Sequence, residues 1–286
     1  MRKGINSWCF SPDLSLETTF KVTKEAGFDS IELNMSESMP QDSITSELGL
    51  IDNPALTLET TELELETIKN LSVTYQLPIS SIATSLHWTY PLTSYDEKVR
   101  VKGLEIAKKM IEVCAVLGGD TVLIVPGVVT ETNSYDDCYD LAQSALKELA
   151  IYAEPLGIVI GVENVWNKFL LSPLEMRRFL DEINHPSVKA YFDAGNVLQF
   201  GFPEQWVRIL GERITKVHIK DFRQDIGNIR GFTGLLSGDM KWSSLMEALR
   251  EIGYNGDVIC ELSPYKENSI QLAYDTSNAM KYILSK

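Results

Sequence analysis

Positive charge and long apolar runs are both scarce in this sequence. Its 286 residues include 26 Lys and Arg against 40 Asp and Glu, which gives a formal net charge of -14. An acidic surface repels phosphate backbones and acidic lipid leaflets, so nucleic-acid and membrane partners are disfavoured. No apolar run approaches the roughly 18 residues of a membrane-spanning helix, and the N-terminus (MRKGINSWCF) lacks an apolar signal segment. We therefore expect a cytoplasmic protein.

Two motifs of common protein classes are also absent. The four cysteines lie far apart and form no Cys-x-x-Cys pair, which indicates free buried thiols in a reducing compartment. No glycine-rich turn follows the first apolar run, where the chain reads SWCFSPDLS. A doubly wound sheet that binds a dinucleotide would carry such a turn, so that architecture is disfavoured.

What the chain does have is an alternation of short apolar runs with longer amphipathic stretches. Runs such as TVLIV and IVIGV are typical of strands buried on both faces. A strand–helix unit repeated eight times predicts an α/β fold, a (β/α)₈ TIM barrel forming a single domain over residues 1–286. The predicted strands are Lys3–Trp8, Ser30–Asn34, Ile79–Leu86, Thr121–Val125, Ile158–Asn164, Val188–Asp193, Lys216–Lys220 and Asp257–Leu262.

Capping residues and glycines mark the ends of the predicted helices. The segment Ser36–Pro54 is polar and irregular, and predicts a long loop over one barrel end. A second segment, Gln224–Ser237, is rich in glycine and predicts a mobile lid. The predicted helices are Ser15–Ala26, Thr57–Gln76, Tyr95–Leu117, Ser134–Leu156, Pro173–Ile183, Pro203–Leu210, Ser243–Ile252 and Asn268–Leu284.

Ionisable side chains stand at the ends of four successive predicted strands. These are Glu163, Asp193, His218 and Glu261. Because the active sites of such barrels lie at the C-terminal strand ends, we expect the four to meet at one mouth. The apolar residues that strand alternation should instead turn toward the helices are Val162, Phe192, Val217 and Cys260.

Three carboxylates in a narrow barrel mouth repel one another, and a divalent cation relieves that repulsion. The mixed oxygen and nitrogen ligand set suits Mn²⁺, Mg²⁺, Co²⁺ or Zn²⁺. Each residue also has a purely structural interpretation. Asp193 or either glutamate could cap the following helix, and a lone histidine is often structural. Their equivalent placement on four strands favours one shared metal site.

Glu163 and Glu261 would face each other across that mouth. A metal stabilises the enediolate oxygens of a hydroxy-ketone and so acidifies the C–H next to its carbonyl. One glutamate could remove that proton and the other could return one. Return to the opposite face gives epimerisation, whereas return to the neighbouring carbon gives ketose–aldose isomerisation.

Several segments resemble the xylose-isomerase-like TIM-barrel superfamily of sugar isomerases, epimerases and inosose-processing enzymes. The resemblance covers most of the chain, from about residue 80 to 265, and is nearest to L-xylulose-5-phosphate 3-epimerases and ketose 3-epimerases. The matching segments are AGFDSIELN (26–34), LHWTYPLTSYDEKVR (86–100), GVENVW (161–166), YFDAGNVLQFG (191–201), KVHIKDF (216–222) and SGDMKWSSLMEALREIGYNGDVICEL (237–262).

The resemblance implies a metal-dependent enzyme of carbohydrate metabolism acting on a small sugar. It implies Glu163, Asp193, His218 and Glu261 as ligands of one divalent ion, with Glu163 and Glu261 also as the acid/base pair. Barrels of this type commonly pair through rim loops, so a homo-oligomer, a dimer or tetramer, is allowed. The residues considered for substrate contact are Trp8, Glu32, His87, Trp166, Asn196, Lys220 and Arg223.

Some of these positions depart from the family pattern. Tagatose-type ketose 3-epimerases carry a histidine three residues after the metal aspartate, whereas this chain has Asn196, as in the pentulose-phosphate epimerases. Those enzymes usually carry arginines after the histidine of strand three. Here the segment is His87-Trp88-Thr89-Tyr90, which weakens the case for a phosphorylated substrate. Arg223 or Arg230 could supply the missing charge, or both could be solvated loop residues.

Three other functions compete with this interpretation. An inosose dehydratase would share the metal and the first proton abstraction but expel a hydroxyl. An endonuclease IV-type enzyme needs three zinc ions and a histidine-rich site, and the chain has only three histidines. A sugar-binding barrel without catalysis would not need all four proposed ligands. Tryptophans at strand ends, such as Trp8 and Trp166, could either stack on a sugar or pack at the barrel rim.

Overall fold

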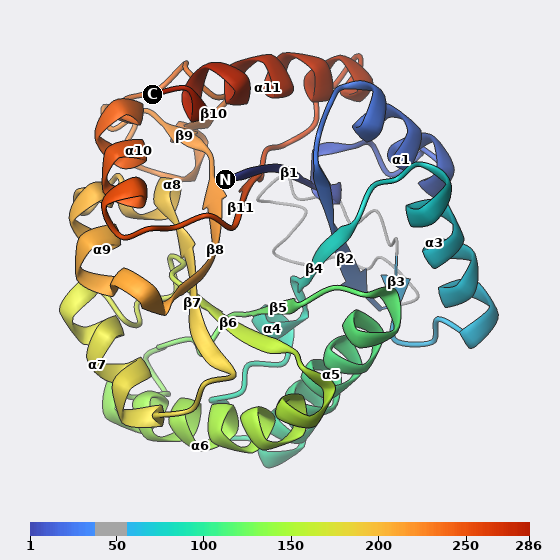
Figure 1. The fold of residues 1–286 in the computed structure, drawn as a ribbon. Coiled ribbons are helices and arrows are strands. Elements are labelled where there is room, and N and C mark those ends of the chain that lie inside the picture. The colour runs from blue at the N-terminus through green and yellow to red at the C-terminus, as the bar shows by residue number, and fades with distance from the viewer. Residues whose placement is uncertain (38–55) are drawn as a thin grey trace.

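Eight parallel strands close into a barrel in the computed structural model, which describes residues 1–37 and 56–286 (Figure 1). The strands follow one another in chain order around the barrel, and pairing of the first with the second closes it. The predicted fold class is confirmed. The barrel strands are β1 (Arg2–Asn6), β2 (Ser30–Ser36), β4 (Ile79–Thr84), β5 (Thr121–Ile124), β6 (Val159–Glu163), β7 (Val188–Asp193), β8 (Ile214–Ile219) and β11 (Asp257–Cys260).

Helices surround the barrel as an outer ring (Figure 1). Their starts follow from capping chemistry: the Ser134 side chain accepts a hydrogen bond from the backbone of Asp137, and Thr61 forms a capping box with Glu64. The major helices are α1 (Leu16–Glu25), α3 (Glu62–Thr74), α5 (Glu97–Leu117), α6 (Tyr135–Ala153), α7 (Pro173–Ile183), α9 (Pro203–Leu210), α10 (Trp242–Glu251) and α11 (Ser269–Leu284).

Some element boundaries differ from the sequence prediction. The predicted first strand stops at Asn6, because the Asn6 side chain accepts from the Trp8 backbone and starts the 3-10 helix η1 (Ser7–Cys9). The predicted helix Thr57–Gln76 begins only at Glu62, after a short strand β3 (Leu56–Thr57) that extends the sheet beside β2. The predicted loop Ser36–Pro54 falls almost entirely outside the described residues.

The second predicted loop, Gln224–Ser237, is partly ordered by hydrogen bonds. It contains the 3-10 helix η4 (Ile229–Gly231) and β10 (Phe232–Thr233), which pairs antiparallel with β9 (Asp221–Phe222) just after β8. The segment therefore folds back onto the strand end that follows His218. Whether it moves as a lid stays a prediction.

Strand alternation sorts the buried side chains into two layers. Between strands and helices lies a large apolar core, and it includes the four residues predicted to face outward: Val162, Phe192, Val217 and Cys260. A smaller cluster of Ala83, Leu123, Val125, Tyr191 and Ile259 forms a separate set. Tyr191 and Ile259 alternate with Phe192 and Cys260 along β7 and β11, so this set lies on the barrel-interior face. The prediction of strand alternation is confirmed.

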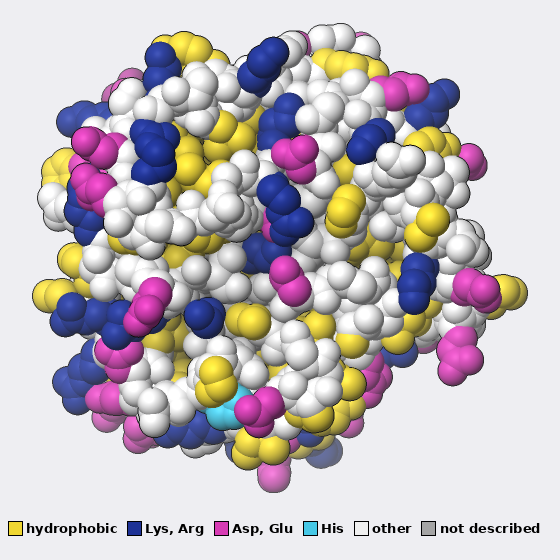
Figure 2. Space-filling view, in the orientation of Figure 1, with side chains coloured by type: hydrophobic (Ala, Val, Ile, Leu, Met, Phe, Trp, Pro, Cys, Tyr) yellow, Lys and Arg dark blue, Asp and Glu magenta, His cyan; other side chains and the backbone are white. Residues whose placement is uncertain are grey.

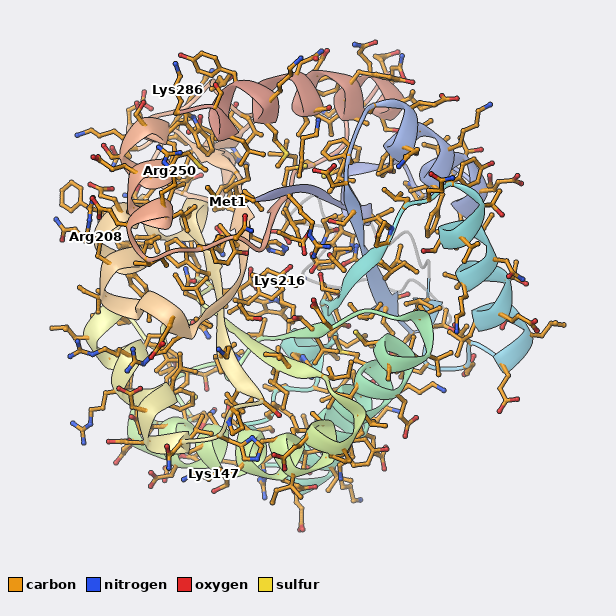
Figure 3. The ribbon with its side chains drawn as sticks, viewed as in Figure 1. Met1, Lys147, Arg208, Lys216, Arg250 and Lys286 are labelled. Atoms are coloured by element: carbon orange, nitrogen blue, oxygen red, sulfur yellow. The ribbon has the colours of Figure 1, made fainter. Side chains whose placement is uncertain are left out.

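The opposite end of the barrel from the predicted site holds a buried ion pair. Lys216 is the third residue of β8, and its Nζ lies 2.7 Å from Oδ2 of Asp257 at the start of β11. The Asp257 carboxylate also accepts hydrogen bonds from the side chains of Arg2 and Ser30. Figure 3 shows Lys216 and Met1 inside the ring of helices.

On the molecular surface shown in Figure 2, Lys and Arg side chains are scattered among Asp and Glu side chains. Over the described residues, no helix is long and apolar enough to span a membrane.

Candidate metal centre

The four residues predicted as ligands come together at the C-terminal strand ends. Glu163 and Asp193 are the last residues of β6 and β7, His218 is the penultimate residue of β8, and Glu261 directly follows β11. One ligand atom from each lies within 4.8 Å of all the others. All four side chains are at most about a tenth exposed. Neighbouring parallel strands thus bring distant parts of the sequence to one point.

His218 points one ring nitrogen at the three carboxylates. Its Nδ1 lies 3.3 Å from Glu163 Oε1, 3.8 Å from Glu261 Oε2 and 4.0 Å from Asp193 Oδ2. Nδ1 is therefore the histidine atom available to a cation held by the carboxylates.

The other ring nitrogen of His218 is held from behind by Glu32. Nε2 lies 2.7 Å from Glu32 Oε1, and both side chains are fully buried. Asn6 Nδ2 (2.6 Å), Ser81 Oγ (2.7 Å) and Tyr191 Oη (2.5 Å) also donate to the Glu32 carboxylate. An ionised carboxylate only accepts hydrogen bonds, so His218 Nε2 must carry the proton that it shares with Glu32. The other nitrogen, Nδ1, is then free to act as a ligand.

Asp193 combines two of the roles considered from the sequence. Its Oδ1 accepts from the backbone of Asn196 at 2.8 Å and caps the short helix α8 (Ala194–Val197). Its Oδ2 faces the other ligands and lies 2.6 Å from Lys220 Nζ. The capping interpretation and the ligand interpretation use different oxygens, so each is compatible with the other.

Asn164 fixes the backbone on which Asp193 stands. Its Oδ1 accepts from Asp193 N at 2.9 Å, and its Nδ2 donates to Asp193 O at 2.8 Å. Asn196 Nδ2 in turn donates to Asn164 O at 3.0 Å, and Trp166 Nε1 donates to Asn196 O at 2.8 Å. A chain of amide hydrogen bonds therefore links the ends of β6 and β7.

Burial and crowding shift the pKa values of the carboxylates in different directions. Burial raises the pKa of Glu163 to about 7, and the charge of Glu261 adds to the rise against the hydrogen bond from His218. Burial also raises the pKa of Asp193, although Lys220 opposes it. Burial favours neutral Glu261 as well, but Lys220 and His218 outweigh this effect and lower its pKa. Lys220 and His218 thus neutralise the cluster only in part.

The donor set fits a divalent cation. Three carboxylates and one imidazole nitrogen converge on a volume small enough for one ion, and the histidine is oriented by a carboxylate as in many protein metal sites. The set does not distinguish Mn²⁺ from Mg²⁺, Co²⁺ or Zn²⁺. All four residues are those that the strand-end pattern indicated.

The residues considered for substrate contact occupy different positions. Trp166 and Lys220 are half-buried beside the ligand cluster, and both contact the Phe232 ring. Asn196 belongs to the amide chain behind Asp193. Glu32 lies behind His218 with its oxygens already engaged.

Among the described residues, no hydrogen bond, ion pair or ring contact joins the three remaining candidates to the four proposed ligands. Trp8 is buried in η1 after β1. His87 is fully buried in the short helix α4 (Leu86–Thr89), where burial lowers its pKa to about 4. Arg223 is exposed and donates to the backbone of Ser237.

The sequence interpretation missed the supporting residues Tyr191, Ser81 and Asn164. Tyr191 stands two residues before Asp193, so strand alternation already placed it on the same face. Asn164 directly follows Glu163. Ser81 gives no signal of its own, because a serine in an apolar strand indicates no particular partner.

A pocket of about 460 Å³ adjoins the amide chain. Its walls include Asn164, Trp166, Phe169, Asn196, Phe200 and Trp206. Trp166 also contacts the rings of Phe200, Phe222 and Phe232, with centroid distances of 5.2–5.5 Å. An aromatic wall therefore stands between this pocket and the segment around β9 and β10.

Comparison with known proteins agrees with this architecture. Residues 20–283 match the family model described as "Xylose isomerase-like TIM barrel". The L-ribulose 3-epimerase of Methylomonas sp. (strain DH-1) is 28% identical over 218 residues, 71% of each chain. The L-ribulose-5-phosphate 3-epimerase UlaE of Salmonella heidelberg is 23% identical over 93% of this chain and 87% of its own.

Two further matches differ in what they cover. The uncharacterized protein MJ1311 of Methanocaldococcus jannaschii is 28% identical, and the match spans 59% of either chain. The crystal structure of a D-tagatose 3-epimerase-like protein superposes with a TM-score of 0.81 at 22% identity, covering 100% of this chain and 97% of the other. At that identity the likeness supports the fold.

Proposed function

The chain belongs to the xylose isomerase-like TIM barrel family, and on that premise we propose that it is a divalent-metal-dependent sugar epimerase or isomerase. The observation that carries the proposal is the convergence of Glu163, Asp193, His218 and Glu261 within 4.8 Å. Relatives named as 3-epimerases of L-ribulose and of L-ribulose 5-phosphate support the reaction class, since epimerases are isomerases.

The proposed mechanism assigns two roles to the glutamates. Glu163, Asp193, His218 and Glu261 would hold the cation, which would polarise oxygens of the sugar and acidify the C–H next to its carbonyl. Glu163 and Glu261 stand on opposite sides of His218 among the strands, so one removes that proton and the other returns one. Return to the opposite face of the same carbon inverts it, and return to the adjacent carbon gives the isomer.

The surrounding residues position and enclose the reacting sugar. Trp166 and Phe232 offer apolar ring faces beside the ligand cluster, and sugars present C–H surfaces to such rings. Lys220 can donate to a sugar oxygen from the same side. Glu32 acts through His218 as a positioning residue. For Trp8, His87, Asn196 and Arg223, contact with substrate stays a prediction.

The experiment that tests the proposal measures exchange of substrate hydrogen with solvent. Purified protein with added Mn²⁺ is incubated in D₂O with free and phosphorylated ketoses in matched pairs, such as L-ribulose and L-ribulose 5-phosphate. Deuterium at one carbon, read by NMR and mass spectrometry, identifies both the reaction and the site of proton removal. The absence of exchange with every sugar tested would count against the proposal.

A parallel sample with an inosose separates the main alternative from epimerisation. An inosose dehydratase would share the first proton abstraction but would then expel a hydroxyl. Its product would have lost one water in the mass spectrum, whereas an epimer or isomer keeps the mass of the substrate apart from the deuterium.

We also propose that the chain forms a homo-oligomer. Apolar side chains near the barrel rim support this: Leu171, Phe200 and Phe202 are 64%, 75% and 56% exposed. Leu171 and Phe200 line the same pocket, and exposed apolar side chains that lie together often mark a protein contact. Light scattering on the purified chain would measure the mass directly, and a monomer at high concentration would contradict this part of the proposal.

A further inference from the structure

Lys220 occupies an unusual position two residues after His218. Its Nζ lies 2.6 Å from Asp193 Oδ2 and forms a second ion pair with Glu261 Oε2. The side chain is only 12% exposed, and Asp193 is fully buried. The ammonium therefore bridges two of the four proposed metal ligands inside the barrel mouth.

The oxygens that Lys220 holds are the ones that face the histidine ligand. Asp193 Oδ2 and Glu261 Oε2 are the carboxylate atoms nearest to His218 Nδ1 on those two residues, at 4.0 and 3.8 Å. The other oxygen of Asp193 is already used in capping α8. A cation coordinated by His218 Nδ1 and Asp193 would therefore use an oxygen that the ammonium also uses, and the Glu261 oxygen nearest to Nδ1 is likewise paired with the ammonium.

From this sharing we propose that Lys220 is a built-in competitor of the divalent cation. Metal binding at this site would then be an exchange, in which the ammonium leaves the carboxylate oxygens of Asp193 and Glu261. The competition weakens metal affinity, and it also stabilises the carboxylate cluster whenever metal is scarce. This inference depends on the proposed metal site but not on the identity of the sugar.

The structure also provides a position for the ammonium after the exchange. Lys220 Nζ lies 5.3 Å from the centre of the Phe232 ring, a distance at which a cation is attracted to the aromatic face. Phe232 belongs to β10, which is tied to β9 immediately after Lys220. A small shift of the side chain toward this ring keeps the charge favourably placed at the mouth.

The test compares Mn²⁺ affinity among variants of the full chain by isothermal titration calorimetry. Lys220→Met removes the competing charge and should bind Mn²⁺ at least about tenfold more tightly. The reason is that a positive charge a few ångströms from a bound cation, in a partly buried site, repels that cation strongly. Lys220→Arg keeps the charge and should stay near the wild-type affinity. Lys220→Gln repeats the neutral substitution if the methionine variant does not fold.

Lys216→Met is the matched control. Lys216 is a buried lysine within β8, but it pairs with Asp257 at the opposite end of the barrel. Its loss should lower stability while Mn²⁺ affinity stays unchanged. Equal or weaker Mn²⁺ binding by the neutral Lys220 variants would overturn the inference, as would equal tightening in Lys216→Met.

Thermal unfolding gives a second readout that does not need catalysis. In excess chelator, Lys220→Met should unfold several degrees below the wild type, since the buried carboxylates of Asp193 and Glu261 lose the ammonium that pairs with them. Saturating Mn²⁺ should raise its unfolding temperature more than it raises that of the wild type. An equal rise in both would contradict the exchange. If the wild type itself binds no divalent metal, the proposed function fails first, and the two failures are therefore distinguishable.

Discussion

His218 Nε2 lies 2.7 Å from Glu32 Oε1, and neither side chain is exposed to solvent. This contact joins β8 to β2 across the barrel and fixes which ring nitrogen faces the carboxylates. Burial opposes ionisation of Glu32, but the charge of His218 and the hydrogen bonds from His218, Tyr191 and Ser81 outweigh it and lower the pKa of Glu32 to about 2. The orientation of His218 toward the three carboxylates therefore depends on Glu32, which is not one of the four proposed ligands.

Glu32→Gln should weaken metal binding without removing a ligand. All four groups around Glu32 donate hydrogen bonds, so the amide NH₂ of glutamine would meet a donor and turn His218. We expect Mn²⁺ affinity to fall by about 10–100-fold, as for other supporting carboxylates. Calorimetry on the variant measures it. Glu251→Gln, which removes a surface partner of Arg208, is the control and should bind Mn²⁺ normally.

The fold could be predicted from the sequence because the apolar runs, their alternation and the strand-end residues all indicated the same barrel. Eight apolar runs with β-branched residues predicted the strands, and alternation along them correctly assigned Phe192 and Cys260 to the helix-facing core. The convergence of the four proposed ligands was predicted for the same reason, since equivalent strand ends of a barrel must meet. Boundaries were less well predicted, because Asn6 and Thr61 set them through local side-chain hydrogen bonds.

The partners of each site residue could not be predicted in this way. Glu32 was expected at the substrate, yet its position behind His218 depends on pairing between strands far apart in sequence. The bridging position of Lys220 depends on how a long side chain turns after β8 ends. Periodicity assigns a residue to a face of a strand, but it does not say which atoms on that face meet.

Asn164→Ala should loosen one metal ligand through its backbone. The substitution removes two hydrogen bonds to Asp193 and should cost about 1–3 kcal/mol of stability, because buried polar groups lose partners. It should also weaken Mn²⁺ binding. Asn167→Ala is a matched control: Asn167 is buried and makes two hydrogen bonds, to Gly127 and Phe169. The control should lose stability but keep its metal affinity. If both variants bind Mn²⁺ equally well, Asn164 has no positioning role.

Glu163→Gln and Glu261→Gln should separate metal binding from proton transfer. Each amide keeps an oxygen that can coordinate, so some Mn²⁺ binding should survive, whereas neither can exchange protons. We expect turnover to fall by about 10²–10⁴-fold, the usual contribution of an acid or base. Solvent deuterium incorporation and product formation are measured at saturating Mn²⁺. Wild-type rates in both variants would rule out the acid/base assignment.

The ion pair at the other end of the barrel should make stability depend on pH. Burial disfavours the charged form of Asp257, but Lys216, Ser30 and Arg2 outweigh burial and lower its pKa. A carboxyl whose pKa is lower in the folded chain binds fewer protons there than in the unfolded chain, so stability rises with pH through that window. The contribution of Asp257 is complete above the unfolded value of about 3.9 and is lost as the pH falls toward its folded pKa.

The substitution Asp257→Asn tests this contribution to stability at the end of the barrel opposite the proposed metal site. At pH 7 the variant should lose about 3 kcal/mol, the low end for breaking a buried ion pair, because Asp120 still lies 2.9 Å from Lys216. Urea unfolding at pH 7, 5, 4 and 3 should show the gap from the wild type narrowing below pH 4. Asp181→Asn breaks an exposed pair with Arg213 and should cost at most about 1 kcal/mol. A gap for Asp257→Asn that stays constant down to pH 3 would show that its hydrogen-bonded shape, and not its charge, stabilises the barrel.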